Sequence, residues 1–263
     1  MDGPNILVTN DDGVESTGLD ALCDALSSVG NVTMVAPNED HSAVGRTLSH
    51  SVTVREHERG YVVDGTPADC TVVGLSTLCP DTDIVVAGCN RGANLGAGTL
   101  GRSGTVSAAV EAVFFDVPAI AVSMYIPNDA YDPETLELNT AMFSSAVDAA
   151  AYLVEHTDET GLFDGVDYLN LNAPIAEEST GEMTLTHPSP VYRLDSTRDG
   201  SEIALEDHIW ELMADDDIPD AEGTDRRAVL DGFISVSPLT ASHSVAGNAE
   251  LDTLVDDYTD GRM

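Results

Sequence analysis

The chain has 263 residues, of which 47 are acidic and 10 basic, and its formal net charge at pH 7 is −37. A chain this acidic repels the phosphates of duplex nucleic acid and of anionic membranes, so we expect it to bind neither. Its length and its 42% hydrophobic content fit one large α/β domain, or such a domain with a small appendage.

The acidic residues are spread along the whole chain, which indicates an acidic folded surface rather than a disordered tail. Their mutual repulsion destabilises the compact state until salt screens it, and at molar salt the Debye length is roughly 3 Å. We therefore predict a salt-requiring protein of a halophile. A cytoplasmic location is expected, because residues 1–4 lead directly into the first predicted strand and no apolar stretch approaches the roughly 20 residues of a membrane span.

Strand and helix patterns alternate over the first two-thirds of the chain. Buried or alternating apolar runs predict strands at 6–10, 32–36, 51–54, 61–63, 84–87, 119–122 and 168–172. Helical periodicity predicts helices at 17–28, from Pro67 with Thr66 as its cap, at 103–115 and at 134–155. This order predicts an α/β fold with a doubly wound, mostly parallel sheet over residues 1–174.

The pattern changes after Pro174. Alternating stretches at 183–186 and 191–194 predict hairpins, followed by a short helix near 224–230 and a strand at 233–236. We expect residues 175–263 to form a C-terminal extension of hairpins and a short helix that packs on the core or on a partner subunit. The four cysteines have no zinc-binding spacing and are expected to be small core residues.

Two adjacent carboxylates, Asp11 and Asp12, follow the first predicted strand and precede Gly13. Ligands of open α/β sheets bind at the carboxyl ends of the strands. Two hard oxygen donors at that edge suit Mg²⁺ or Mn²⁺ and hence phosphate chemistry. Acidic pairs elsewhere in this chain are best explained by solvation. The metal-site interpretation of Asp11 and Asp12 therefore depends on their position after the first predicted strand.

Two later polar loops add neutral oxygen donors, Ser42 in 36–42 and Asn90 in 88–96. With the two aspartates they make a plausible oxygen site for a hard cation, with positions left for water and phosphate. Asn90 and Asn94 are also explained by turn chemistry, because asparagine tolerates left-handed backbone angles.

A third segment, Ser103-Gly104-Thr105-Val106, opens a predicted helix after a glycine-rich loop. A helix N-terminus offers free N–H groups and the positive end of a dipole, which is a ready anion site. An ordinary serine N-cap explains Ser103 equally well.

Several phosphate-handling and hydrolytic classes are disfavoured. The chain contains no lysine, which excludes a P-loop and counts against aspartyl-phosphate enzymes of the haloacid-dehalogenase type. Residues 101–105 miss the last glycine of the serine-hydrolase motif G-x-S-x-G, and no G-x-G-x-x-G follows the first strand. The seven histidines are scattered and are expected to be surface or packing residues.

The ordered set of segments resembles the SurE survival-protein nucleotidases. The resemblance rests on residues 7–13, 35–37 followed by Ser42, 64–70, 88–96, 103–106, 171–174 and 236–239. It implies a Rossmann-like, metal-dependent phosphomonoesterase that hydrolyses nucleoside 5′-monophosphates to nucleoside and phosphate.

The same resemblance implies roles for particular residues. Asp11, Asp12, Ser42 and Asn90 would bind one divalent cation, Mn²⁺ or Mg²⁺, with one of the two aspartates as general base. Asn94, Ser103, Gly104 and Thr105 would hold the phosphate. The resemblance also implies a homodimer or homotetramer in which the C-terminal extension is exchanged between subunits.

Three features depart from the family pattern. Ala97-Gly98 stand where the family often has an acidic residue, Arg102 replaces an aromatic residue or histidine, and the loop 38–47 is acidic rather than basic. These departures put substrate preference in question. Broader 3′-nucleotidase or exopolyphosphatase activity, and a nucleotide-binding protein without turnover, stay open as alternatives.

Overall fold

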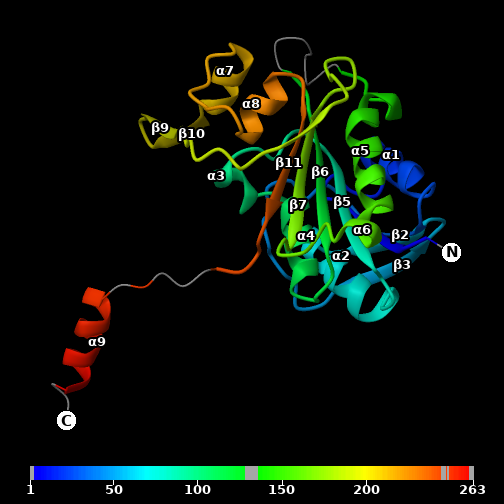
Figure 1. Ribbon diagram of the computed structural model, residues 1–263, viewed down its shortest axis with the longest axis horizontal. Coiled ribbons are helices and arrows are strands. Elements are labelled where there is room, and N and C mark those ends of the chain that lie inside the picture. The colour runs from blue at the N-terminus through cyan, green and yellow to red at the C-terminus, as the bar shows by residue number, and fades with distance from the viewer. Residues whose placement is uncertain (1–2, 128–135, 244–246, 248, 261–263) are drawn as a thin grey trace.

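A nine-stranded sheet forms the centre of the computed structural model, which describes residues 3–127, 136–243, 247 and 249–260 (Figure 1). The strand order is β3-β4-β2-β1-β5-β6-β7-β11-β8, and β9 and β10 form a separate two-stranded sheet. The strands are β1 (Asn5–Thr9), β2 (Asn31–Pro37), β3 (Thr53–His57), β4 (Gly60–Asp64), β5 (Ile84–Arg91), β6 (Ala119–Tyr125), β7 (Tyr168–Pro174), β8 (Met183–Leu185), β9 (Leu194–Asp199), β10 (Glu202–Asp207) and β11 (Ile234–Leu239). The α-helices are α1 (Thr17–Leu26), α2 (Pro67–Val73), α3 (Ala97–Leu100), α4 (Gly104–Val113), α5 (Ser144–Glu155), α6 (Thr157–Thr160), α7 (Ile209–Ala214), α8 (Asp225–Leu230) and α9 (Ala249–Asp260).

The predicted doubly wound, mostly parallel sheet is confirmed. β1 lies between β2 and β5 and pairs in parallel with both, and the parallel ladder continues through β6 to β7. Antiparallel pairing occurs only between β3 and β4 at one edge and between β7 and β11 near the other, among the described strands of this sheet. The carboxyl ends of β1, β5, β6 and β7 therefore share one edge of the sheet.

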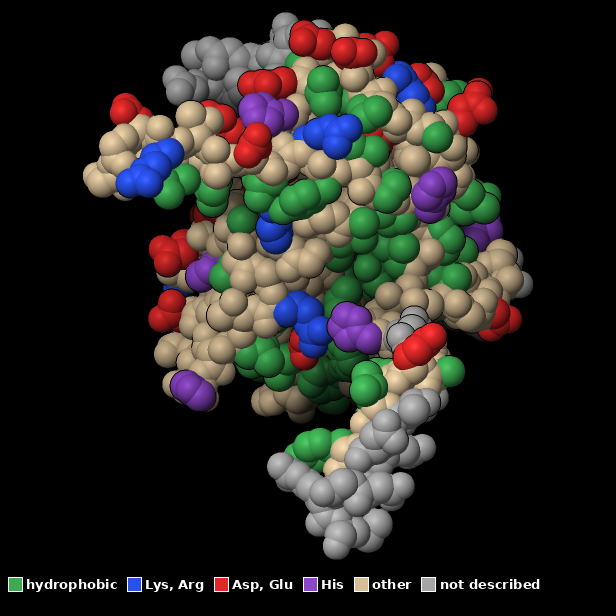
Figure 2. All heavy atoms as spheres, turned by 90° about the vertical axis from the view of Figure 1, so that its left-hand side faces the viewer, with side chains coloured by type: hydrophobic (Ala, Val, Ile, Leu, Met, Phe, Trp, Pro, Cys, Tyr) green, Lys and Arg blue, Asp and Glu red, His purple; other side chains and the backbone are tan. Residues whose placement is uncertain are grey.

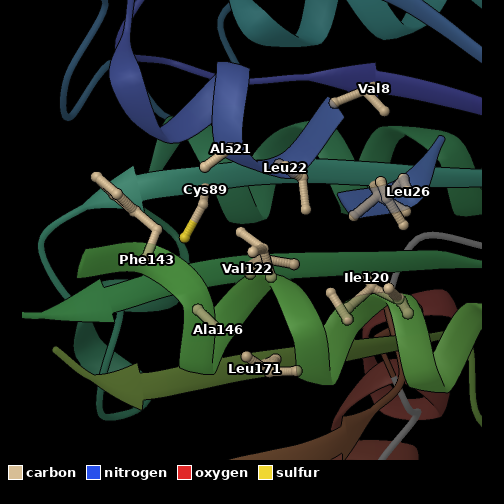
Figure 3. Packing of buried hydrophobic residues seen from close by; sticks show 14 of the residues in the cluster. Val8, Ala21, Leu22, Leu26, Cys89, Ile120, Val122, Phe143, Ala146 and Leu171 are labelled. Atoms are coloured by element: carbon tan, nitrogen blue, oxygen red, sulfur yellow. The ribbon is translucent and has the colours of Figure 1, made fainter. Parts of the chain in front are cut away.

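Helices cover both faces of the sheet because successive side chains of each strand point to opposite sides. Ile6 and Val8 of β1 belong to the core under α1 and α5, whereas Leu7 belongs to the core under α2 and α4. Figure 3 shows the first of these cores, with Leu22 of α1 and Ala146 of α5 facing the sheet. All three β1 side chains are at most 1% exposed, as expected for a central parallel strand.

The predicted start of α2 is confirmed in detail. Pro67 is its first residue, and the Thr66 side chain accepts a hydrogen bond from the Asp69 N–H. The Asp69 carboxylate in turn accepts from the Thr66 N–H, completing a capping box.

The prediction of one helix over 134–155 is wrong. Residues 134–135 lie outside the described part of the chain, but residues 136–139 are not helical and α5 begins only at Ser144, after a 3₁₀ turn at Thr140–Phe143. Asn139 explains the late start, because its side chain accepts a hydrogen bond from the Ala141 N–H and so caps the turn.

The predicted hairpins at 183–186 and 191–194 are also wrong. β8 pairs in parallel with β11, and the hairpin of this region is formed by β9 and β10. Alternation in the sequence indicates a strand but not its partner, which here comes from about fifty residues further along the chain. The predicted helix near 224–230 and strand at 233–236 correspond to α8 and β11, whereas α7 and α9 were not predicted.

All four cysteines are free thiols, and Cys23, Cys70 and Cys89 are buried in the two main cores, as predicted. Within the described residues no helix is long and apolar enough to cross a membrane.

Candidate active site

The turn after β1 is held by the buried side chain of Asn10. Its amide nitrogen donates to the Gly13 carbonyl at 2.9 Å and to Ser16 Oγ at 2.8 Å. These bonds fix the chain where it leaves the sheet. Asp11 and Asp12 are thereby placed at the carboxyl edge, where the sequence predicts them.

Asp11 is buried between the end of β1 and the start of α4. Thr105 Oγ1 donates a hydrogen bond to Asp11 Oδ1, and the His41 N–H donates to the Asp11 carbonyl at 2.8 Å. Burial raises the pKa of the Asp11 carboxyl, and the hydrogen bonds from Thr105 oppose that rise. Thr105 thus fixes the orientation of this carboxylate.

Asp12 is half-buried, and its Oδ2 accepts a hydrogen bond at 2.9 Å from the Arg91 N–H at the end of β5. The pKa of Asp12 is raised to about 7, mainly by burial and also by the nearby charges of Asp11 and Asp40, while the hydrogen bond from Arg91 opposes the rise. Like charges crowded in a poorly solvated place disfavour ionisation. A cation bound among these acids would reverse this preference.

The loop after β2 contacts Asp11 through the His41 N–H, but the Ser42 side chain of this loop is bonded to Asp40. Ser42 is exposed, and its Oγ donates to Asp40 Oδ1 at 2.6 Å. Asp40 is close enough to raise the pKa of both Asp11 and Asp12. This loop therefore brings the charge of Asp40 near the two aspartates, an effect that was not predicted from the sequence.

Asn90 lies near the end of β5, one residue before the N–H that bonds Asp12. Its Nδ2 donates to the Gly92 carbonyl at 2.7 Å, and this bond fixes the side chain. The other end of the amide, Oδ1, is a hydrogen-bond acceptor. This placement suits a neutral oxygen ligand beside the carboxylates.

The start of α4 packs directly on Asp11. Ser103 is the N-cap, and its side chain accepts from the Val106 N–H at 3.1 Å. A Cβ added to Gly104 would lie 2.7 Å from Asp11 Cβ and Oδ2, so only glycine fits there. Gly104 and Thr105 therefore lie against Asp11, and Ser103 acts as the ordinary cap that the sequence also allowed.

Asn94, in the loop after β5, is buried in a polar cluster with side chains of two strands, β6 and β7. Its Nδ2 donates to Ser123 Oγ of β6 at 2.9 Å, and its N–H donates to Asn172 Oδ1 of β7 at 2.8 Å. Its carbonyl accepts from Asn170 Nδ2 at 2.9 Å and from Asn172 Nδ2 at 3.2 Å. These bonds fix the glycine-rich loop against the sheet.

Ser123, Asn170 and Asn172 were not proposed as site residues from the sequence, and all three are fully buried. A signal was present, since Asn170 and Asn172 stand two residues apart in an otherwise apolar strand and so share one face. Buried polar side chains need partners, and two on one face indicate a polar cluster.

Asp225, at the start of α8, was also missed. It is fully buried and accepts hydrogen bonds from the N–H groups of Gly96 at 2.7 Å, Ser189 at 2.9 Å and Arg226 at 2.8 Å. Burial raises its pKa in spite of these bonds. It ties the C-terminal segment to the loop that carries Asn94.

The donor set fits a hard divalent cation better than a soft one. Within the described residues no three His, Cys, Asp or Glu side chains form a cluster that could hold a metal ion, so a site here would need neutral oxygen donors beside the two aspartates. Asp11, Asp12 and Asn90 instead offer carboxylate and amide oxygens, the ligands of Mg²⁺ and Mn²⁺. The pKa of both aspartates is raised mainly by burial, and neighbouring carboxylates add to the rise, so a bound cation would favour their charged forms.

Arg102 lies at the rim of this region. Its guanidinium carbon is 5.8 Å from the centre of the Tyr192 ring, and its Nη2 is 3.8 Å from Asp207 Oδ2 at the end of β10. The side chain thus connects the start of α4 to the β9–β10 hairpin.

A parallel sheet with paired carboxylates at its carboxyl edge, beside a helix N-terminus, defines an α/β protein of the class that binds its ligand at the strand ends. The chain belongs to the SurE family: the family model described as "Survival protein SurE" matches residues 6–193. This confirms the resemblance inferred from the ordered segments.

Relatives and solved structures agree with this assignment. The 5′-nucleotidase SurE of Haloarcula marismortui is 60% identical over 98% of this chain and 96% of its own length, and that of Haloquadratum walsbyi is 52% identical over 97% of both. The crystal structure of SurE protein from Aquifex aeolicus has a TM-score of 0.70 and 30% identity, and covers 97% of this chain and all of its own. Similarity to proteins of halophilic archaea confirms the halophilic source predicted from the charge.

Proposed function

We propose that this chain is a metal-dependent phosphomonoesterase that hydrolyses nucleoside 5′-monophosphates to nucleoside and phosphate. The nucleotidase activity is supported by full-length relatives named 5′-nucleotidase SurE. The observation that carries the proposal is the packing of Asp11 against the start of α4, with Thr105 bonded to Asp11 and with Asp12 bonded to the end of β5.

Each residue of the site has a proposed role. Asp11, Asp12, Ser42 and Asn90 would hold one divalent cation, Mn²⁺ or Mg²⁺. Such a cation, when bound, polarises phosphoryl oxygens and lowers the pKa of a water. Asp40 orients Ser42 through its hydrogen bond, and Thr105 orients Asp11.

The phosphate would lie against Asn94, Ser103, Gly104 and Thr105. The N-terminus of α4 supplies N–H groups and the positive end of its dipole on that side, which stabilises negative charge on the phosphoryl oxygens. One of the two aspartates would accept the proton of the attacking water.

The test is phosphate release from a panel of nucleoside 5′-monophosphates at molar KCl with Mn²⁺, Mg²⁺ or EDTA. Wild type should release phosphate only with metal, and Asp11→Asn and Asp12→Asn should each lose more than about a hundredfold in turnover. Asp148→Asn on α5 is the control, because it removes the same charge from an exposed site on another part of the surface. Metal-independent release, or full activity in both variants, would contradict the proposal.

We also propose that the chain assembles as a homodimer or homotetramer through its extension, residues 175–263. α9 extends away from the body of the molecule (Figure 1), and Leu251, Leu254, Val255 and Tyr258 share one face of it, each more than half exposed. Ile203 and Leu205 on the β9–β10 hairpin are also exposed. Exposed apolar faces of this kind mark association surfaces.

Light scattering of full-length protein at molar KCl tests the assembly. Wild type should have the mass of an oligomer, and Leu254→Asp should shift the mass toward the monomer. A monomeric wild type would contradict the proposed assembly.

A cytoplasmic location is proposed as well, supported by four free thiols, which persist in reducing compartments.

A further inference from the structure

A pocket adjoins the candidate site on the side of β5. Its volume is about 270 Å³, and its walls come from the ends of β5 and β6 and from α7 of the extension. The lining side chains include Asn90, Ala93, Tyr125, Ile126, Leu136 and Trp210. The walls are therefore mainly apolar, and two of the lining side chains are aromatic.

The pocket is continuous with the residues of the proposed metal site. Asn90, a proposed ligand, is itself part of the wall. The next residue, Arg91, also lines the pocket, and its N–H bonds the Asp12 carboxylate at 2.9 Å. A substrate with its phosphate at the aspartates therefore has this pocket as a neighbouring space.

Trp210 is the only tryptophan of the chain and is half-buried. It packs against the small cluster that contains Ala93, Tyr125 and Met213, which holds the indole in place. A fixed aromatic ring binds a flat partner without a large loss of side-chain entropy. Aromatic side chains stack on purine and pyrimidine bases alike, because every base has a π-face.

We propose that this hollow, the Trp210 pocket, receives the nucleobase of the substrate, with Trp210 as its stacking residue. The inference rests on the proposed nucleotidase function and adds to it the part of the substrate that lies away from the phosphate. The lining favours a neutral heterocycle over a second phosphate group, since most of the described lining side chains are apolar or aromatic and only Arg91 among them is charged. A specific base is not selected by stacking alone.

The sole tryptophan gives a direct binding test that needs no turnover. Adenosine and AMP, added in EDTA at molar KCl, should change the Trp210 emission in a saturable way. Ribose 5-phosphate, which has no base, should leave the emission unchanged. An emission that does not respond to either adenosine or AMP, at concentrations above the KM for AMP, would overturn the inference.

Kinetics separate stacking from a merely structural role of Trp210. In Trp210→Leu the ratio of kcat/KM for AMP to that for ribose 5-phosphate should fall about tenfold, mostly through the KM for AMP. Trp210→Phe should restore most of the ratio, because phenylalanine keeps an aromatic face. Tyr152→Leu, which removes an exposed aromatic ring from α5, is the matched control and should leave the ratio unchanged.

Two outcomes are kept apart by this design. Equal losses on AMP and ribose 5-phosphate in Trp210→Leu would overturn the nucleobase inference and leave the nucleotidase intact. Failure of wild type to release phosphate from either substrate would instead contradict the proposed function, and the adenosine titration would still decide whether the pocket takes a base.

Discussion

At the scale of single residues, the hydroxyl of Thr105 is the side-chain donor that holds Asp11. It is fully buried and bonds a carboxylate whose burial raises its pKa. Thr105→Val keeps the shape of the side chain and removes the donor. We expect turnover to fall about 10- to 100-fold and the free energy of unfolding to fall by about 1–3 kcal/mol.

Phosphate release and thermal unfolding of the variant measure these two effects. Thr105→Ser is the control, because it restores the hydroxyl, and should recover most of the turnover. Wild-type activity in Thr105→Val would show that the orientation of Asp11 does not depend on this bond.

The paired aspartates also predict that metal stabilises the fold. A ligand that binds only the native state adds about 2.7 kcal/mol to the free energy of unfolding at a concentration of 100 Kd. Mn²⁺ at constant ionic strength should therefore raise the Tm of wild type, and EDTA should abolish the rise. The rise should be lost in Asp12→Asn, and a variant that keeps it would remove Asp12 from the ligand set.

At the scale of elements, the start of α4 can approach β1 only because residue 104 has no side chain. Gly104→Ala would place a methyl group 2.7 Å from Asp11 Oδ2. We expect turnover to fall more than about tenfold while the helix itself remains, since alanine is the better helix former.

Gly101→Ala is the matched control three residues earlier. Its φ is −74° and a Cβ there meets no atom within 4 Å, so alanine should be tolerated or stabilising by about 0.4–1 kcal/mol. Steady-state kinetics and thermal unfolding of the two variants separate the effect of the contact from that of adding a methyl group. Equal kinetics in both variants would contradict the close approach of α4 to Asp11.

The contact between the extension and the glycine-rich loop depends on Asp225. Asp225→Ala removes the acceptor for three backbone N–H groups, and we expect a loss of about 3 kcal/mol in the free energy of unfolding. Asp231→Ala removes an exposed partner of Arg227 at 2.7 Å and should cost less than about 1 kcal/mol. Urea unfolding at molar KCl measures the difference, and equal costs would contradict the role of Asp225.

At the scale of the whole molecule, the charge of −37 governs the dependence on salt. Figure 2 shows Asp and Glu side chains distributed around one face of the molecule rather than gathered in one patch. Screening shortens the Debye length from about 10 Å at 0.1 M to about 3 Å at 1 M, so the Tm should rise steadily with KCl over that range. A neutral osmolyte at the same water activity should raise the Tm less, and a Tm independent of KCl would contradict this account.

The sequence predicted the central sheet well because the evidence for it is local. The apolar run before Asp11 and the runs at β5, β6 and β7 identify buried strands without knowledge of their partners. Because the patterns are local, two other predictions, the helix at 134–155 and the hairpin at 183–186, were wrong. The Asn139 cap divides what reads as one helix at 134–155, and β8 alternates like a hairpin arm although it pairs with β11.

By itself, then, the sequence determined the class of fold, the acidic surface and the polar segments that follow the strands, because periodicity, charge and turn residues act over a few neighbouring positions. Only the tertiary structure decided how those segments meet. Thr105 bonds Asp11 across 94 residues, Gly96 bonds Asp225 across 129, and Trp210 joins a pocket with Asn90. Contacts at such separations follow from the order of strands in the sheet and the packing of the extension, which no local pattern encodes.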